Sequence, residues 1–487
     1  MSSDTPISTA QDALTRSGID RSLRHPVMFF LMSGSAWLAI SMLLGLISSV
    51  KIHNPDFMSD CATMSLGRVY AAHVNTLVYG WGMQAAFAMI LWLMARLSGK
   101  ECSMIGSILT AGHLWNIGIA IGVVGILAGF GTGMPWMEFP PFAWPVLLVA
   151  YAVIVIGSFI QFRVRPEGGA MISQWYLLAA MIWFPWVYLT ANILLHCIPG
   201  HPVMAAGINA WFKSGMVFLF FTPVALGTVY YITPKVTGLP IFSNQLAKIG
   251  FWSLAIIAPW AGMQKLAGAP IPIFLPYVGG AATALIFIPA CAAAVNNLRS
   301  ILANRETLAL SPALRFTFAG LISLVILVIC GVFLNLPNST LKASQFSMAG
   351  YSAEILAMYG FFSFVIFGAA YFIVPRVTRR EWLSRRLIRW HFLFSVYGII
   401  TVAAVALIGG YLQGTDQENW ELPWMTAAQT GAAYAVAITF AWCMILLSNF
   451  FFFIHLTLMW LRLGRRGPNP TLLTNPHAAD ALDSAAH

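Results

Sequence analysis

Three ionisable side chains occur in stretches of sequence that are otherwise apolar: Lys213, Lys265 and Glu354. Glu354 is the only acidic residue inside the core of an apolar stretch long enough to span a bilayer. A lone charge in the middle of a membrane helix costs at least about 2.5–3.5 kcal/mol and is usually paired. A lysine near a helix end can instead extend its ammonium group to water. The sequence therefore predicts either an intramembrane ion pair or two lysines that reach solvent.

Cysteine and histidine patterns exclude two common kinds of metal site. The six cysteines form no Cys-x-x-Cys pair and no Cys-x-x-Cys-His motif. Neither a zinc ribbon nor a covalent haem attachment site is therefore predicted. No histidine occurs between His201 and His391.

The surrounding chain has the composition of a polytopic membrane protein. Hydrophobic residues make up 59% and charged residues only 9% of its 487 residues, whereas a soluble domain carries about 25% charged residues. Apolar stretches of about 20 residues cross the hydrocarbon core as helices, because lipid offers no partner for bare backbone amides. The sequence predicts twelve spans, at 27–50, 69–95, 104–129, 142–161, 172–195, 207–233, 246–268, 272–296, 314–335, 349–374, 391–412 and 430–460.

Basic residues predict the orientation of these spans. With the N-terminus in the cytoplasm, all but five of the 26 Lys and Arg residues lie on the cytoplasmic side, as the positive-inside rule requires. This topology explains the net charge of +10 without nucleic-acid binding. We expect cytoplasmic tails at 1–25 and 464–487, with a single membrane domain at 26–463. The five exceptions are Lys51, Arg68, Lys213, Lys265 and Lys342.

Four segments carry distinctive motifs: MSLGRVYAAHVNTLVYGWG (64–82), GTGMPWMEFPPFAWPVLLVAYAVIVIGSFIQ (131–161), GTVYYITPKVTGLPIFSNQLAKIGFWSLAIIAPWAG (227–262) and GAAYFIVPRV with LIRWHF (368–377, 387–392). They resemble subunit I of the haem–copper oxidases, the C-type (cbb-type) cytochrome c oxidases above all. The resemblance covers nearly the whole chain in order. It implies an all-α, twelve-helix subunit I bundle in the bacterial plasma membrane, beside a membrane-anchored c-type cytochrome.

The resemblance fails at the copper centre. The positions of the family's copper histidines fall on Ser214, Gln264 and Lys265, and that of its cross-linked tyrosine falls on Ala258. Metal affinity depends on the type, number and geometry of the ligands. Because serine, glutamine and protonated lysine are poor substitutes for imidazole, copper is not expected.

The haem ligands are reduced to one histidine. The family's two haem histidines on helix ten fall on Ala353 and Ile355. His73 keeps the position of the low-spin haem ligand on helix two, and Arg68, before it, is the predicted propionate contact. Two interpretations of His73 remain open: it holds one b-type haem, or it is an inherited histidine that hydrogen-bonds between helices.

If the family fold holds, Lys213, Lys265 and Glu354 converge where metals lie in the oxidases. We then predict an ion pair between Lys265 and Glu354, with Lys213 sharing the carboxylate.

Three functions are compatible with these residues. The first is a degenerate subunit I homologue that is non-catalytic, or carries a single haem, in a respiratory electron-transfer complex. The second is an active cytochrome c oxidase or nitric oxide reductase subunit, which the missing histidines oppose. The third is an ion or solute pathway through the Lys/Glu cluster, since intramembrane charges often mark such pathways.

Overall fold

Among the residues that the structure describes, twelve helical segments are long and apolar enough to cross a membrane. The computed structural model describes residues 6–165, 168–198, 200–336 and 339–465. Within these ranges the protein is all-helical, with no strand beyond one isolated bridge between Glu381 and Arg465. The predicted fold class and number of spans are confirmed.

The first six spans run from residue 24 to residue 237. Their elements are α2 (Arg24–His53); α3 (Leu66–Asn75), η2 (Thr76–Met83) and α4 (Gln84–Ser98); α5 (Ile105–Ala128); α6 (Ala143–Arg163); α7 (Ile172–Asn192) with η3 (Ile193–Cys197); and α8 (Pro202–Gly215), η4 (Met216–Phe221) and α9 (Thr222–Thr237).

The last six spans run from residue 244 to residue 460. Their elements are α10 (Asn244–Ile257), η5 (Ala258–Trp260) and η6 (Met263–Leu266); α11 (Phe274–Leu285) and α12 (Phe287–Ala303); α14 (Pro312–Leu334); α16 (Ala349–Ile355), η7 (Leu356–Ser363) and α17 (Phe364–Thr378); α18 (Arg385–Glu418); and α19 (Trp424–Trp460). Four short helices lie outside the spans: α1 (Pro6–Ser22), η1 (Ala62–Met64), α13 (Arg305–Leu310) and α15 (Thr340–Ser344).

The second, sixth and tenth spans form the core of the bundle. In the most apolar 18-residue stretch of each span, all residues of the second and tenth spans are buried, and 89% of those of the sixth. In the other nine spans the buried share of this stretch is 39–56%. Each of the three contains a π-helical segment (η2, η4 and η7), and η7 contacts both of the others. Such wide turns inside α-helices are frequent at functional sites.

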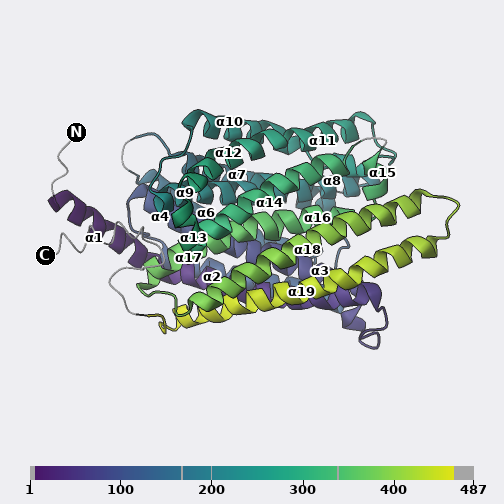
Figure 1. Cartoon of the computed structure of the whole chain (residues 1–487), viewed down its shortest axis with the longest axis horizontal. Coiled ribbons are helices and arrows are strands. Elements are labelled where there is room, and N and C mark those ends of the chain that lie inside the picture. The colour runs from purple at the N-terminus through teal and green to yellow at the C-terminus, as the bar shows by residue number, and fades with distance from the viewer. Residues whose placement is uncertain (1–5, 166–167, 199, 337–338, 466–487) are drawn as a thin grey trace.

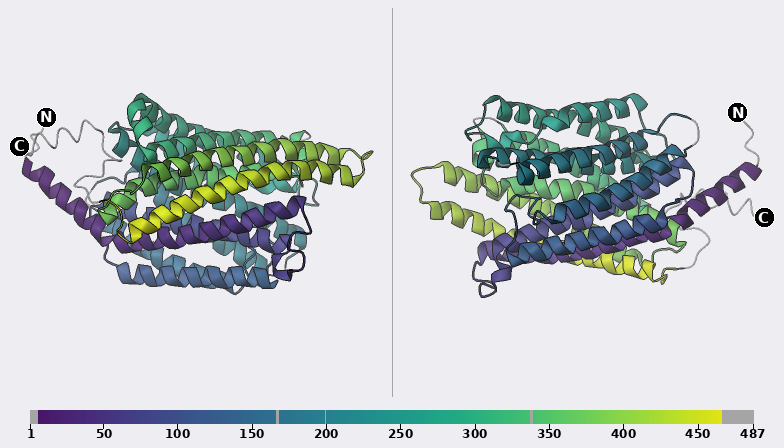
Figure 2. Two further views of the ribbon diagram at one scale, coloured as in Figure 1. Left: turned by 60° about the horizontal axis from the view of Figure 1, so that its bottom comes forward. Right: turned by 180° about the vertical axis from the view of Figure 1, so that it is seen from behind.

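The two ends of the bundle differ. The helix α1 lies at one end, and α15 lies at the other together with the turn between α18 and α19 (Figure 1). We call these the α1 end and the α15 end. The α18–α19 hairpin extends beyond the other helices at the α15 end (Figure 2). Its helices have 34 and 37 residues, about 50 Å or more at 1.5 Å per residue, so they exceed the ~30 Å hydrocarbon core.

Part of the segment predicted as an N-terminal tail is the helix α1, which packs on α4 and α17. Asp20 near its end is buried, accepts a hydrogen bond from Trp92 Nε1 at 3.0 Å and pairs with Arg96 at 3.2 Å. Burial raises the pKa of Asp20, opposed by the nearby Arg96. Of the predicted C-terminal tail, only residues 464 and 465 fall within the described part of the chain.

Candidate functional site

The structure brings Lys213, Lys265 and Glu354 together. Lys213 Nζ lies 2.6 Å from Glu354 Oε1, and Lys265 Nζ lies 3.9 Å from the same oxygen. Lys213 therefore takes the closer position that the sequence analysis assigned to Lys265. The side chains of Lys213 and Glu354 are 17% and 22% exposed, whereas that of Lys265 is 50% exposed. Lys213 and Glu354 form the inner ion pair, and Lys265 lies at its open side.

A cavity of about 110 Å³ surrounds this charge cluster. Its walls include Ser214, Gln264 and Lys265, the positions to which the resemblance assigns copper histidines, and Ala353, one of the assigned haem positions. Residues from three separate spans thus meet at one place, as the alignment of motifs predicts. Ala258 and Ile355 do not line the cavity.

A break in the seventh span explains why Lys265 lies further out than Lys213. Gly262 has a φ of +113°, and a Cβ on it would lie 2.6 Å from the carbonyl oxygen of Ala210 on α8. Only glycine allows both this conformation and this close approach. The chain then continues as the short 3₁₀ helix η6, which carries Lys265 toward the α15 end. Lys213, in contrast, lies on the continuous α8–η4–α9 span.

The loop between α5 and α6 adds two residues that the sequence analysis missed. Trp136 lies with its ring centroid 5.7 Å from Lys213 Nζ, within cation–π range. Glu138 is 7% exposed and accepts a hydrogen bond from Asn75 Nδ2 at 2.5 Å. Burial raises the pKa of Glu138 to about 7, although the Asn75 amide and the Lys213 ammonium both oppose the shift. A second carboxyl group therefore lies near the cluster.

Hydrogen bonds hold this loop against the core. Tyr79 donates its hydroxyl to the carbonyl oxygen of Trp136 at 2.8 Å, and Asn209 Nδ2 donates to that of Pro135 at 2.8 Å. Hydropathy gave no sign of Glu138, because the loop lies outside every predicted span. The one available signal was a single acid flanked by aromatic and apolar residues in PWMEFPPF.

His73 lies between helices in a closed environment. Its Nδ1 donates to the carbonyl oxygen of Ser41 at 2.7 Å and lies 3.0 Å from Ser41 Oγ, which itself donates to the carbonyl oxygen of His73 at 2.8 Å. Its ring meets Trp442 edge-on at 5.1 Å between centroids. A Cβ on Gly45 would lie 2.9 Å from Nδ1. These contacts are the kind expected from the second interpretation of His73, a histidine that hydrogen-bonds between helices.

Arg68 hydrogen-bonds to backbone carbonyls at the α15 end. Its Nη1 donates to the carbonyl oxygens of Ala62 at 2.9 Å and Leu127 at 3.2 Å. These bonds direct the guanidinium toward the end of α5. The structure therefore does not bring Arg68 into contact with His73.

Side chains fill the space between the second and tenth spans. Trp81 Nε1 donates to Ser363 Oγ at 2.8 Å, and the Trp81 ring stacks on Phe367 at 5.3 Å. Phe221 and Met358 pack against Gly82. A Cβ at this position would lie 2.8 Å from the Phe221 ring and 3.2 Å from the Met358 methyl group. The span is therefore tightly packed at Trp81 and Gly82, eight and nine residues after His73, and we derive no chemistry through a haem.

The donor set is equally poor for a metal. Among the described residues, no group of three or more His, Cys, Asp or Glu side chains could hold a metal ion. In the cavity, Glu354 is the single carboxylate beside two ammonium groups, and an ammonium offers no lone pair to a metal.

Comparison with known proteins identifies the family. The sequence matches the family described as Cytochrome C and Quinol oxidase polypeptide I over residues 25–448. The chain belongs to this oxidase subunit I family. The resemblance drawn from the motifs is therefore confirmed.

Relatives of this subunit I homologue have low sequence identity to it. It is 23% identical to the "Cytochrome c oxidase subunit 1 homolog" of Azorhizobium caulinodans over 398 residues, covering 78% of this chain and 70% of the relative. It is also 23% identical to the "Cbb3-type cytochrome c oxidase subunit CcoN1" of Stutzerimonas stutzeri over 395 residues, 78% and 81% of the two chains. The solved structure of a haem–copper terminal oxidase dimer matches with a TM-score of 0.76 at 15% identity, over 92% of this chain and 86% of that one.

Proposed function

We propose that this chain is a non-catalytic oxidase subunit I homologue, a membrane component of a respiratory complex that does not itself reduce oxygen. The observation that carries the proposal is the Lys213–Glu354–Lys265 cluster in a cavity also lined by Ser214, Gln264 and Ala353. Ser214, Gln264, Lys265 and Ala353 are the positions at which the motif alignment with the family expects imidazoles for copper and haem.

The chemistry of the cluster supports this proposal. Two ammonium groups and one carboxylate carry a net charge of +1, which repels a metal cation rather than binding it. An ion pair with an N–O distance of 2.6 Å also uses the carboxylate oxygen that a metal would need. The cluster therefore acts as a structural tie between the sixth and tenth spans, in place of a cofactor.

The family and the distribution of basic residues support the following cellular setting. The protein lies in the bacterial plasma membrane with both termini in the cytoplasm, so the α15 end faces outward. A membrane-anchored c-type cytochrome is the partner that the cbb-type resemblance favours. In this role the chain would shape or assemble the complex, while electrons are carried by other subunits.

Cofactor analysis of the purified protein tests the proposal. We expect neither stoichiometric copper by elemental analysis nor a b-type spectrum by pyridine haemochrome, and no oxygen or nitric oxide consumption with a reduced electron donor. A b-type spectrum that disappears in the His73→Leu variant would establish the single-haem alternative. Copper together with oxygen consumption would overturn the proposal.

A further inference from the structure

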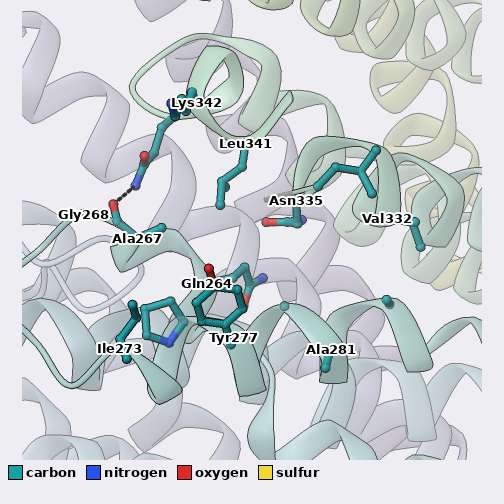
Figure 3. Close-up of a pocket in the computed structure, with 15 residues that line it drawn as sticks. Gln264, Ala267, Gly268, Ile273, Tyr277, Ala281, Val332, Asn335, Leu341 and Lys342 are labelled. Carbon is teal, nitrogen blue, oxygen red and sulfur yellow. Dashed lines mark hydrogen bonds between the residues drawn. The ribbon is translucent and has the colours of Figure 1, made fainter. Parts of the chain in front are cut away.

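A second cavity, of about 640 Å³, lies at the α15 end between α11, α14, α15 and η6 (Figure 3). One wall is a face of α11 formed by Tyr277, Gly280, Ala281 and Ala284, which recur three and four residues apart and so share one side of the helix. Beyond Tyr277, the small residues Gly280, Ala281 and Ala284 on this face leave room for a slender apolar group. No residue that lines the cavity is acidic.

The inner end of the cavity is polar. Gln264 is only 5% exposed, and its Oε1 accepts a hydrogen bond from the Gly262 amide at 2.9 Å. Its Nε2 donates no hydrogen bond to any described residue, and it keeps exposed surface at the cavity, so it is available to a ligand. Gln264 and Asn335 line both this cavity and the one around the charge cluster. An unused donor thus lies at the junction of the two cavities.

The charged side chains at this cavity are basic. Lys342 lines the cavity, and no carboxylate within the described ranges pairs with it. The backbone of Lys265 adjoins the cavity. Gln345, which lines the cavity, donates from Nε2 to the carbonyl oxygens of Lys265 and Ala267 at 3.0 Å each. The ammonium group of Lys265 is half exposed and is the outer member of the charge cluster. The local field therefore favours an anion.

The rim of the cavity is apolar and exposed. Ile273 is 75% exposed, Tyr277 54% and Leu336 43%. In a membrane-spanning bundle such residues near a helix end face lipid, and tyrosine is typical of the bilayer interface. A ligand that enters here comes from the membrane and needs an apolar chain.

We propose that this cavity binds an anionic phospholipid from the leaflet at the α15 end. One acyl chain lies along the small-residue face of α11. The phosphate accepts a hydrogen bond from Gln264 Nε2 and lies near Lys342, since basic pockets between membrane helices recognise anionic lipid head groups. This inference does not depend on whether the chain binds haem or copper.

Native mass spectrometry of the full-length protein in detergent tests the site, with phosphatidylglycerol, phosphatidylcholine and oleate as the probes. We expect preferential retention of phosphatidylglycerol. The Ala281→Trp variant, which fills the cavity, should abolish this preference, whereas the lipid-facing control Ile329→Trp on α14 should keep it. Lys342→Gln should weaken phosphatidylglycerol binding about fivefold, whereas Lys248→Gln, at the α1 end, should not.

Equal retention of phosphatidylglycerol and phosphatidylcholine would overturn the assignment of an anionic head group. Unchanged binding in both Ala281→Trp and Lys342→Gln would overturn the site itself. Retention of oleate without phosphatidylglycerol would overturn the phospholipid and assign the cavity to a free fatty acid. If Ala281→Trp does not fold, as judged by gel filtration, Lys342→Gln at an exposed position still decides the question.

Discussion

Breaking the inner ion pair should destabilise the protein far more than removing its outer lysine. At the 2.6 Å separation of Lys213 and Glu354, the gross attraction is about 6 kcal/mol for an effective dielectric constant near 20. Desolvation offsets much of this gain, but removing one partner leaves the other charge buried and costs about 3 kcal/mol or more. At 3.9 Å and half exposed, Lys265 should contribute less than about 1 kcal/mol.

A double-mutant cycle measures this difference. The variants are Lys213→Met, Glu354→Gln and the double variant, with Lys265→Met as the matched control. The assay is the free energy of unfolding in mixed micelles. We expect each single variant of the inner pair to lose about 3 kcal/mol and the double variant to recover a large part of that loss, because replacing both members of a buried pair is often nearly neutral. A coupling energy near zero, or a larger loss for Lys265→Met than for Lys213→Met, would refute the geometry described above.

Three further predictions follow from other features. The pKa of Glu138 is raised from 4.5 to about 7, so this carboxyl binds its proton more tightly in the folded protein. The free energy of unfolding should therefore be highest below about pH 4.5 and fall by roughly 3 kcal/mol as the pH rises through 7. Glu138→Gln should abolish this slope when unfolding is measured from about pH 5 to 8, and a slope that persists would contradict the assignment. Asp20→Ala should loosen α1, because it removes the contacts to Trp92 and Arg96; tryptic cleavage after Arg21 should then accelerate, while the exposed Asp56→Ala variant should match the parent protein. Gly414→Ala should be strongly destabilising because its Cβ would overlap the carbonyl oxygen of Ala343, whereas Gly350→Ala meets nothing within 4 Å and should unfold at the parent temperature or above.

The sequence predicted the number and order of the spans because each carries an apolar stretch of membrane length. It placed the span boundaries less well. The eleventh span was predicted at 391–412 but covers Arg385–Glu418, since the polar sequence QGTDQE continues the helix beyond the apolar stretch. Hydropathy locates the part of a helix that lies in lipid, but it does not detect a part of the same helix that continues into water.

Part of the candidate site could also be predicted. A lone Glu354 among apolar residues demanded a cationic partner, and the motif alignment supplied both lysines. The order of the two lysines could not be predicted, because it depends on the positive φ of Gly262 and on the turn that follows. Glu138 could not be found by composition, since a loop that folds into the protein interior has no periodic signal in the sequence.

The π-helical segments in the three core spans make the lengths of these helices unusually strict. A π turn holds extra residues relative to an α turn, so the two halves of each span are fixed in a particular rotational phase. Deleting one residue from Leu356–Ser363 would favour ordinary α-helix and so change the rotational phase between the two halves of the span. The Glu354 carboxylate would then turn away from its position beside Lys213 while Phe364–Thr378 stayed in place. Insertions and deletions should therefore be tolerated in the connecting loops and rejected at these three segments.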